Sequence, residues 1–311
     1  MSASGGTRAV VAALVANAGI AVAKFAGFAL TRSSAMLAEA VHSVADMSNQ
    51  ALLLLGGRRS RRAPTEAHPF GHGRERYFWS FVVALVLFAV GAAFAVYEGI
   101  DKVRHPHEVD AVGVAVAILA AGIVLEAWSL RTAVVEASPM KGERTWRDFV
   151  VRSRNPELPV VLLEDVGALL GLVIALAAIG LSATTGEPRW DGAGTIAIGL
   201  LLGVIAIVLA REMQSLLIGE SADADDQAAI RVAVESAPGV VALVHLRTQH
   251  LGPDEILVGA RVAFESTLNA AGVATAIDDV ERLVREAVPT AHPIYVEAAT
   301  PDAANHPPGL P

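Results

Sequence analysis

The sequence predicts a membrane protein in which six helical spans are followed by a small soluble α/β domain. Hydrophobic residues make up 53% of the 311 residues and charged residues only 18%, whereas soluble domains carry about 25% charge. The apolar residues fall in long runs, which is typical of membrane helices. After Arg211 the pattern changes, and helical and strand-like stretches alternate as in a small folded domain.

Each apolar run is about 20 residues long, the length that a helix needs to cross the hydrocarbon core. The turn "TRSS" joins the first two runs, and the Gly, Pro and Asp of "SATTGEPRWDG" mark a turn between the last two. The predicted spans lie near residues 9–30, 35–57, 78–100, 111–133, 158–181 and 192–211. The predicted domains are a six-span membrane domain over 1–211, a soluble domain over 212–300 and a disordered tail over 301–311.

Lys and Arg are distributed unevenly between the connections of these spans, and this distribution predicts the orientation. The connection after span two holds six Arg, and the connection after span four holds six basic residues. The connections on the opposite side hold only Arg32, Lys102, Arg104 and Arg189. Because basic residues favour the cytosolic side, both termini are predicted to be cytosolic, in agreement with an even number of spans.

The soluble domain is predicted as helix, strand, strand, helix, strand. In "DADDQAAIRVAVESA", Asp223, Asp225 and Asp226 favour a helix start through the helix dipole, and apolar residues follow at helical spacing. "GVVALVHLRTQHLG" and "EILVGARVAFES" are strand-like and are separated by the turn residues "GPD". "AAGVATAIDDVERLVREAV" predicts a second helix and "HPIYVEAA" a third strand. The order αββαβ predicts a small open α/β sandwich with one sheet.

Span two carries ionisable residues in the middle of its apolar run. Winding the span at about 100° per residue places five polar side chains on one stripe. His42 and Asp46 are four residues apart, so that an imidazole nitrogen and a carboxylate oxygen can approach one cation. A charge inside the bilayer costs about 2.5–3.5 kcal/mol on insertion scales, and a divalent cation or an exchanging proton would offset that cost. The stripe consists of Glu39, His42, Ser43, Asp46 and Asn49.

Span five carries the predicted partner of this stripe. Glu164 and Asp165 lie about two turns inside the span. As neighbours they point about 100° apart, so one would bind an ion while the other bonds to a nearby side chain. Gly167 and Gly171 form a small-xxx-small pair that allows another helix to pack closely. Lys24 in span one would balance the carboxylates when no metal is bound.

Each of these residues also has a structural interpretation. His42 could bond only to its neighbours, Glu39 could lie at the membrane interface, and Lys24 could snorkel or serve structure. The coincidence of the span-two stripe with a carboxylate pair in another span predicts an intramembrane cation site. Imidazole with carboxylates suits Zn²⁺, and also Fe²⁺, Mn²⁺ or Co²⁺, but suits K⁺ and Na⁺ poorly. The chain has no Cys, which excludes thiolate ligands.

Three stretches resemble the cation diffusion facilitator family of proton-coupled divalent-metal exporters. They are "SSAMLAEAVHSVADMSNQALLLLG", "HPFGHGRERYFWS" and "LRTQHLGPDEILVGARVAF". "LLED" in span five and the later "GLSATTGEPRWDGAGTIAIGLLLG" resemble the zinc transporter nine branch. The resemblance implies a six-helix transmembrane domain, a cytosolic ferredoxin-like domain and a homodimer. It also implies alternating access, in which metal leaves the cytosol against incoming protons.

The resemblance assigns ligands position by position. His42 and Asp46 match the two span-two ligands of the family's transport site. Most of the family has a His or an Asp in span five, followed four residues later by an Asp. With Asp165 at the second position, Val161 falls on the first, which departs from the family pattern. Glu164 is the candidate for the missing ligand, with water as the alternative. Carboxylate in place of imidazole makes the site harder and favours Mn²⁺ or Fe²⁺ against Zn²⁺.

Two further sites are implied by the resemblance. His68 and His72 match a metal site in the family's cytosolic loop, although both could instead only order a polar loop. The family often carries a dimer-bridging metal site in the tail, which is expected to be missing or rebuilt here, so that the tail serves dimerisation. The matching positions are Val244, Ala260, Glu297 and Ala299, from which His245, His250 and His292 are displaced.

The predicted function is proton-coupled export of a divalent metal from the cytosol, with zinc as the favoured substrate. Export of manganese, iron or cobalt by the same family is one alternative, and a non-transporting membrane scaffold, which would need no ionisable stripe, is another. An intramembrane metalloprotease would need a motif such as H-E-x-x-H, which the sequence lacks, so no enzyme is expected. Membrane lipid and a second copy of the chain are the expected partners, nucleic acid is not, and the cell membrane is the expected location.

Overall fold

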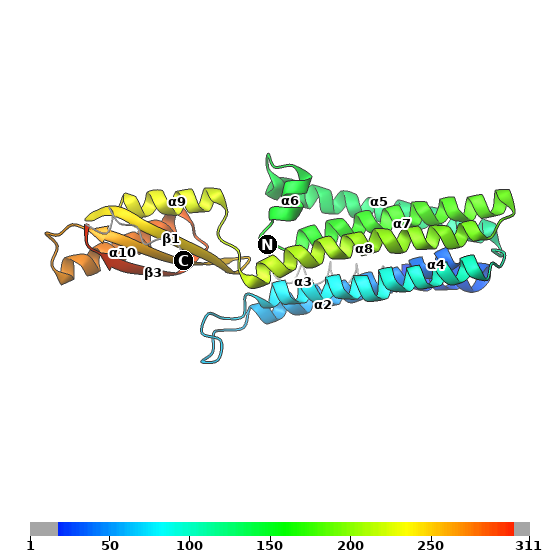
Figure 1. Ribbon diagram of the computed structural model, residues 1–311, viewed down its shortest axis with the longest axis horizontal. Coiled ribbons are helices and arrows are strands. Elements are labelled where there is room, and N and C mark those ends of the chain that lie inside the picture. The colour runs from blue at the N-terminus through cyan, green and yellow to red at the C-terminus, as the bar shows by residue number, and fades with distance from the viewer. Residues whose placement is uncertain (1–17, 302–311) are drawn as a thin grey trace. The chain divides into compact units, whose positions relative to one another are not determined.

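The computed structural model describes residues 18–301, with long helices in the first part of the chain and a three-stranded sheet in the last part (Figure 1). The chain separates into two units. One contains the described residues up to Arg58 together with Tyr77–Gln214. The other contains Arg59–Arg76 and the described residues from Ser215 onward. Residues 9–17 of the predicted first span, and all but the first residue of the predicted tail, lie outside the described part of the chain.

The first unit is helical, and within residues 18–301 four helices are long and apolar enough to cross a membrane. They are Glu75–Arg104, Val112–Lys141, Glu157–Thr185 and Arg189–Ile218. The first of these is continuous but contains a π-helical segment, which the sequence analysis did not predict. The helical elements in chain order are Ala18–Thr31, α2 (Ser34–Ser60), α3 (Glu75–Val86), η1 (Leu87–Ala93), α4 (Phe94–Arg104), α5 (Val112–Lys141), α6 (Trp146–Arg152), α7 (Glu157–Thr185) and α8 (Arg189–Ile218).

The first two predicted spans are not among the four helices of the described residues that are long and apolar enough to cross a membrane, and each has a physical reason. Ala18–Thr31 is the described part of span one, and it is shorter than the roughly 20 residues that a crossing requires. α2 is 27 residues long, but its polar stripe and the arginines at its end reduce its apolar character. The four apolar helices make the protein an integral membrane protein, and the number of six spans stays a prediction.

Close helix packing at the predicted small-xxx-small pair of α7 is confirmed. A Cβ atom on Gly167 would lie 2.7 Å from the Cδ1 atom of Ile205 on α8, and a Cβ atom on Gly171 would lie 2.5 Å from Oε1 of Glu39 on α2. Real Cβ atoms essentially never make contacts this short, so a larger residue at either position would force the Ile205 or Glu39 side chain to move. α7 therefore packs tightly against both α2 and α8.

The apolar core of the helical unit draws side chains from α2, α5, α7 and α8. Met36, Leu119, Leu172 and Leu202 are each at most 1% exposed and belong to one cluster. α6 is a short helix that the sequence analysis did not predict. Its Phe149 is buried in a smaller cluster with side chains of α5 and α7. These packed surfaces hold the middle sections of α2, α5 and α7 in fixed positions within the unit.

The second unit has the predicted element order αββαβ. β1 and β2 form an antiparallel hairpin, and β3 pairs parallel to β2 after the crossover through α10. Asp223 caps α9 by accepting a hydrogen bond from the backbone N of Asp226 at 2.9 Å, as an N-cap aspartate does. The elements are α9 (Ala224–Glu235), β1 (Val240–Gly252), β2 (Glu255–Phe264), α10 (Ala270–Ala287) and β3 (Ala291–Ala299).

The core of this unit lies between one face of the sheet and the two helices. Val258 and Val262 alternate along β2 and are fully buried, as a half-buried strand requires. Val280 and Val284 are four residues apart on α10 and are buried against them. The C-terminal region is therefore a small α+β unit built on a three-stranded sheet, and its ferredoxin-like classification stays a prediction.

The loop after α2 packs on the β1–β2 hairpin of the second unit. Arg76 donates a hydrogen bond from Nη1 to Oδ2 of Asp254 at 2.8 Å. The backbone of Gly73 lies so close to Leu251 that an added Cβ atom would meet the Leu251 carbonyl oxygen at 2.8 Å. The Arg-rich connection, which contains His68 and His72, is thereby attached to the sheet unit.

Candidate functional site

The polar stripe of α2 is turned into the helical unit. Glu39, His42, Ser43 and Asn49 are each at most 4% exposed. The side chain of Asp46 is 17% exposed. Spacings of three and four residues place these groups on one side of the helix, where α7 packs closely at Gly171. The stripe therefore faces neighbouring helices, as it must if it is to be functional.

Lys24 neutralises the first carboxylate of the stripe. Its Nζ atom lies 3.2 Å from Oε2 of Glu39 and donates a hydrogen bond to Oγ of Ser43 at 2.8 Å. Both charged side chains are at most 1% exposed, so the pair is fully buried. Glu39 is thus a buried partner of Lys24, and the interface alternative does not fit its position.

His42 is the most isolated polar group of the stripe. Its ring is 1% exposed, and neither ring nitrogen has a hydrogen-bond partner among the described residues. Nδ1 lies 3.6 Å from Oδ1 of Asp46, which is too long for a hydrogen bond. Oδ1 of Asp46 also lacks a partner within residues 18–301. A burial this costly without compensating bonds is typical of a functional group.

A cavity of about 60 Å³ lies beside Asp46 between α2, α5 and α7. It is large enough for a water molecule or a single ion. Four carboxylates from three helices line it, together with amide, hydroxyl and apolar side chains. The lining consists of Ile20, Ser43, Asp46, Gln50, Leu125, Glu126, Ser129, Val161, Glu164, Asp165 and Ala168.

The two acidic residues of α7 both line the cavity and both bond to a neighbour. Oε1 of Glu164 accepts a hydrogen bond of 2.6 Å from Nδ2 of Asn49. Oδ2 of Asp165 accepts a hydrogen bond of 3.0 Å from Oγ of Ser129. Glu164 is only 6% exposed. The sequence predicts that one of the two bonds to a neighbour while the other binds an ion. In the structure both bond to a neighbour, and both line the cavity.

The structure brings three of the four predicted transport-site residues to one cavity. Asp46, Glu164 and Asp165 line it. His42 does not line it, but its Nδ1 lies 3.6 Å from Oδ1 of Asp46. Within residues 18–301, no three His, Asp or Glu side chains gather closely enough to hold a metal ion in this conformation. The carboxylates line the cavity but lie too far from one another to bind one ion together in this conformation.

Glu126 is a cavity residue that the sequence reasoning missed. It lies in the middle of α5, where it is the only charged residue between Val112 and Leu130. An isolated carboxylate in an apolar run is a recognisable indication of function. No second ionisable residue follows at helical spacing, however, and so the pattern that drew attention to span two is absent from span four.

His68 and His72 lie in the connection between α2 and α3. Their ring centroids are 4.6 Å apart and the rings are tilted by 37°. His68 is exposed, and its backbone N donates to both the carbonyl and the hydroxyl oxygen of Thr65. The two imidazoles therefore lie side by side in a loop held by its own turns.

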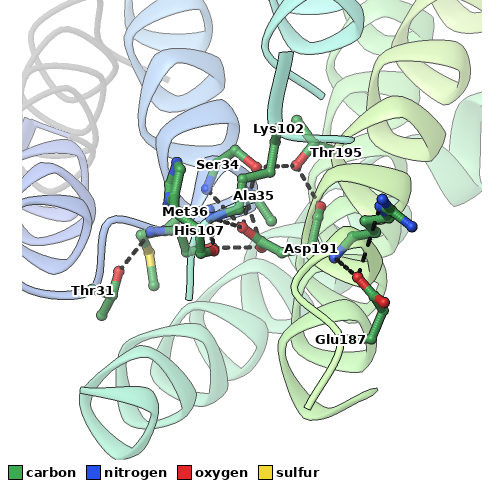
Figure 2. Close-up of polar contacts among 11 residues, drawn as sticks. Thr31, Ser34, Ala35, Met36, Lys102, His107, Glu187, Asp191 and Thr195 are labelled. Carbon is green, nitrogen blue, oxygen red and sulfur yellow. Dashed lines mark hydrogen bonds and ion pairs between the residues drawn. The ribbon is translucent and has the colours of Figure 1, made fainter. Parts of the chain in front are cut away.

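A second buried acid, Asp191 at the start of α8, is surrounded by donors (Figure 2). Its Oδ1 accepts from Oγ of Ser33 at 2.7 Å, and its Oδ2 accepts from the backbone N of Ser34 at 2.9 Å. Oγ of Ser34 donates to the same Oδ2 at 3.1 Å, and Nζ of Lys102 lies 3.9 Å away. Asp191 thus caps the first turn of α2 and joins it to α4 and α8.

These features define the class of protein. Ionisable side chains inside a helical membrane unit are typical of proteins that move ions or protons. Residues 10–218 match the family described as cation efflux transmembrane domain. The chain belongs to the cation diffusion facilitator family, and within it to the zinc transporter nine-like branch.

Three relatives illustrate this membership. The proton-coupled zinc antiporter SLC30A9 of Xenopus laevis, named as mitochondrial, is 36% identical over 245 residues, which cover 78% of this chain and 44% of the relative. Metal tolerance protein C4 of Arabidopsis thaliana is 32% identical over 263 residues, which cover 84% and 58%. Zinc transporter ZitB of Escherichia coli is 29% identical over 198 residues, which cover 63% and 57%. The matched region thus spans about half the length of these relatives.

Proposed function

We propose that the protein exports Zn²⁺ from the cytosol in exchange for protons. The observation that carries this proposal is the cavity between α2, α5 and α7, where Asp46, Glu164 and Asp165 meet beside the buried His42. An imidazole with carboxylates is a donor set for Zn²⁺. Nothing in a purely structural helix bundle accounts for keeping these groups inside the bilayer with so few bonds.

The same groups explain how metal and protons would exchange. Carboxylates and imidazole bind a metal only when they are deprotonated, so metal binding releases protons and proton binding releases metal. Alternating access would expose the cavity first to the cytosol and then to the opposite side. Metal would enter in the first state, and protons arriving from the other side would displace it in the second.

The names of the relatives support zinc and proton coupling. The Xenopus relative is named a proton-coupled zinc antiporter and the Escherichia coli relative a zinc transporter. The same donor set also suits manganese, iron and cobalt as substrates. With Val161 at the cavity wall where most of the family has a ligand, carboxylates outnumber the single imidazole, and oxygen ligands favour harder ions such as Mn²⁺.

The wider architecture is part of this proposal. We propose six spans with both termini in the cytosol, a membrane domain over 1–211, and a ferredoxin-like domain over 212–300 through which two copies of the chain form a homodimer. The αββαβ order and the parallel β2–β3 pairing support the fold of that domain. We place the protein in the cell membrane, with the mitochondrion as the alternative that the name of the Xenopus relative favours.

We also propose that His68 and His72 bind a second metal ion in the cytosolic loop. The 4.6 Å separation of their ring centroids supports this role. Two imidazoles alone do not complete a zinc site, which needs about four ligands, so water or a further side chain would supply the rest. If the two residues only order the loop, replacing both by Asn will leave the metal stoichiometry unchanged.

The test is metal transport by the purified full chain in proteoliposomes with an imposed pH gradient. We expect Zn²⁺ to accumulate inside vesicles whose lumen is acidic, and accumulation to stop when an ionophore collapses the gradient. Parallel runs with Mn²⁺, Fe²⁺ and Co²⁺ rank the substrates. Vesicles that accumulate none of the four ions above the protein-free control would contradict the proposal and favour the scaffold alternative.

A further inference from the structure

The fourth carboxylate of the cavity comes from a helix that has no assigned role. Glu126 of α5 lines the same cavity as Asp46, Glu164 and Asp165. Ser129 lies three residues later on α5, lines the cavity too, and donates to Asp165 of α7. The cavity-facing side of α5 is therefore in direct contact with the acidic face of α7.

Close packing fixes Glu126 in this position. α5 packs along α7, and Gly122, one turn before Glu126, lies so close to α7 that an added Cβ atom would meet Cδ2 of Leu172 at 3.2 Å. Because helices in contact at this level cannot rotate freely, the glutamate side chain is held at the cavity. It is not free to turn toward the lipid without moving the helix.

The charges around the cavity are not balanced within the described residues. Glu126 has no hydrogen bond or ion pair with any residue between 18 and 301, and Lys24 is committed to Glu39. Glu164 and Asp165 receive bonds only from the neutral Asn49 and Ser129. Lys24 acts electrostatically on Asp46 and Glu126 as well as on Glu39, but one lysine cannot balance this many carboxylates, so the site requires a cation or protons.

A second, independent observation indicates a ligand at this place. The imidazole of His42 is 1% exposed, both of its nitrogens lack partners among the described residues, and Nδ1 lies 3.6 Å from Oδ1 of the cavity residue Asp46. A buried imidazole with no bonding partner, next to a carboxylate with an unpartnered oxygen, leaves donor atoms that an ion could satisfy.

Val161 leaves space for a ligand from another helix. It lines the cavity on α7, one turn before Asp165, and carries no atom that can bind an ion. Glu126 faces the same space from α5. We infer that Glu126 is a ligand of the transported divalent cation and supplies the donor that Val161 cannot, so that the site takes ligands from three helices. This inference rests on the proposed transport function.

The assignment has a consequence for ion preference. A glutamate oxygen at this position makes the site harder than a histidine would, because carboxylates favour Mn²⁺ and imidazole favours Zn²⁺. Glu126 is thus a specificity-determining residue as well as a ligand. Its removal should weaken Mn²⁺ binding more than Zn²⁺ binding, an effect that a merely structural role would not produce.

The experiment measures Zn²⁺ and Mn²⁺ binding to the purified full chain by equilibrium dialysis in detergent. The variants are Glu126→Gln, Glu126→Asp, and Glu126→Gln combined with Val161→Asp. Glu136→Gln is the matched control, because Glu136 lies on the same helix but is exposed and outside the cavity. Asp46→Asn serves as the reference for loss of the site.

We expect Glu126→Gln to weaken Zn²⁺ binding by about 10- to 100-fold, in the range known for groups that support a metal site, and Mn²⁺ binding by more. Glu136→Gln should bind as the unmodified chain does, and the added Val161→Asp should restore binding. If Glu126→Gln fails to fold, Glu126→Asp, which keeps the charge but shortens the side chain, should still weaken binding.

The outcomes separate this inference from the proposed function. Unchanged binding by Glu126→Gln or by Glu126→Asp, together with loss of binding in Asp46→Asn, would overturn the role of Glu126 and leave the transport proposal standing. An unmodified chain that binds neither ion would overturn both.

Discussion

Buried acids of the same helical unit differ in how many hydrogen-bond donors surround them. Asp191 is 0% exposed and accepts hydrogen bonds from the hydroxyls of Ser33 and Ser34 and from backbone N atoms at the start of α2. Around the cavity, by contrast, Asp46 has an oxygen without a partner, and Glu126 has no bond to any described residue.

The difference separates an acid whose hydrogen bonds stabilise the fold from acids that the fold leaves short of donors. A buried carboxylate that is saturated with donors repays the cost of its desolvation through those bonds. A buried carboxylate without donors destabilises the fold, and proteins keep such residues mainly at functional sites. Asp191 therefore stabilises the fold, whereas Asp46 and Glu126, which lack such donors, fit the proposed role of ion ligands.

The largest effect is expected where the cavity acids are removed. Asp46→Asn keeps the shape of the side chain but removes a charge that the proposed ion needs, so we expect metal transport in proteoliposomes to be abolished. Its stability in detergent should be unchanged or improved, because a poorly partnered charge is lost. Full transport by this variant would remove Asp46 from the site.

For Asp191→Ala we expect the opposite of Asp46→Asn, namely a loss of stability with metal binding retained. The substitution leaves the start of α2 without its cap and leaves Lys102, which is 1% exposed, without its carboxylate. Breaking a buried pair in this way costs about 3–5 kcal/mol, which thermal unfolding in detergent would detect as a lower midpoint. The fraction that stays folded should still bind Zn²⁺. Equal stability to the unmodified chain would show that Asp191 is not a scaffold residue.

Lys24 and Glu39 extend the comparison to α2 itself, because Glu39 is paired with a buried cation whereas His42 and Asp46 of the same stripe are not. Lys24→Met should destabilise the chain by about 3–5 kcal/mol, since Glu39 is then buried alone, and adding Glu39→Gln should recover most of that loss. A double variant as unstable as the single one would mean that the two side chains act independently.

The smallest effect is expected for Ser129→Ala. It removes one hydrogen bond to Asp165, at 3.0 Å, without removing a charge. The hydroxyl donor is neutral and the bond to the carboxylate is exposed, so its loss should cost only about 1 kcal/mol, and we expect Zn²⁺ affinity to fall about fivefold, as measured by equilibrium dialysis. Ser138→Ala on the same helix, where the hydroxyl bonds only to the backbone oxygen of Val134, is the control.

Local patterns in the sequence were sufficient for much of the fold. The αββαβ order could be predicted because strand alternation, helical spacing and turn residues each act over a few positions. The stripe of α2 could be predicted for the same reason, since winding one helix is enough to align Glu39, His42 and Asp46. The small-residue pair of α7 likewise needed only its own spacing to predict close packing.

The cavity could be predicted only in part, because its walls come from helices far apart in the chain. Glu126 meets Asp46 and Asp165 through tertiary packing that no local pattern specifies. Asp191 caps a helix that begins more than 150 residues earlier, with 157 residues separating it from Ser34. The π-helical turn of Leu87–Ala93 and the short α6 have no distinctive composition and were not predicted either.

The hydrogen bonds between Asp191 and the first turn of α2 anchor that end of the helix, so any tilt of α2 would pivot there. Asp46 lies twelve residues beyond Ser34, which places it about 18 Å along the helix axis from that anchored end. A tilt of about 10° around the pivot would therefore swing Asp46 sideways by about 3 Å. A rotation this small, with the anchored turn left intact, would therefore change the distances between Asp46 and the acids of α5 and α7.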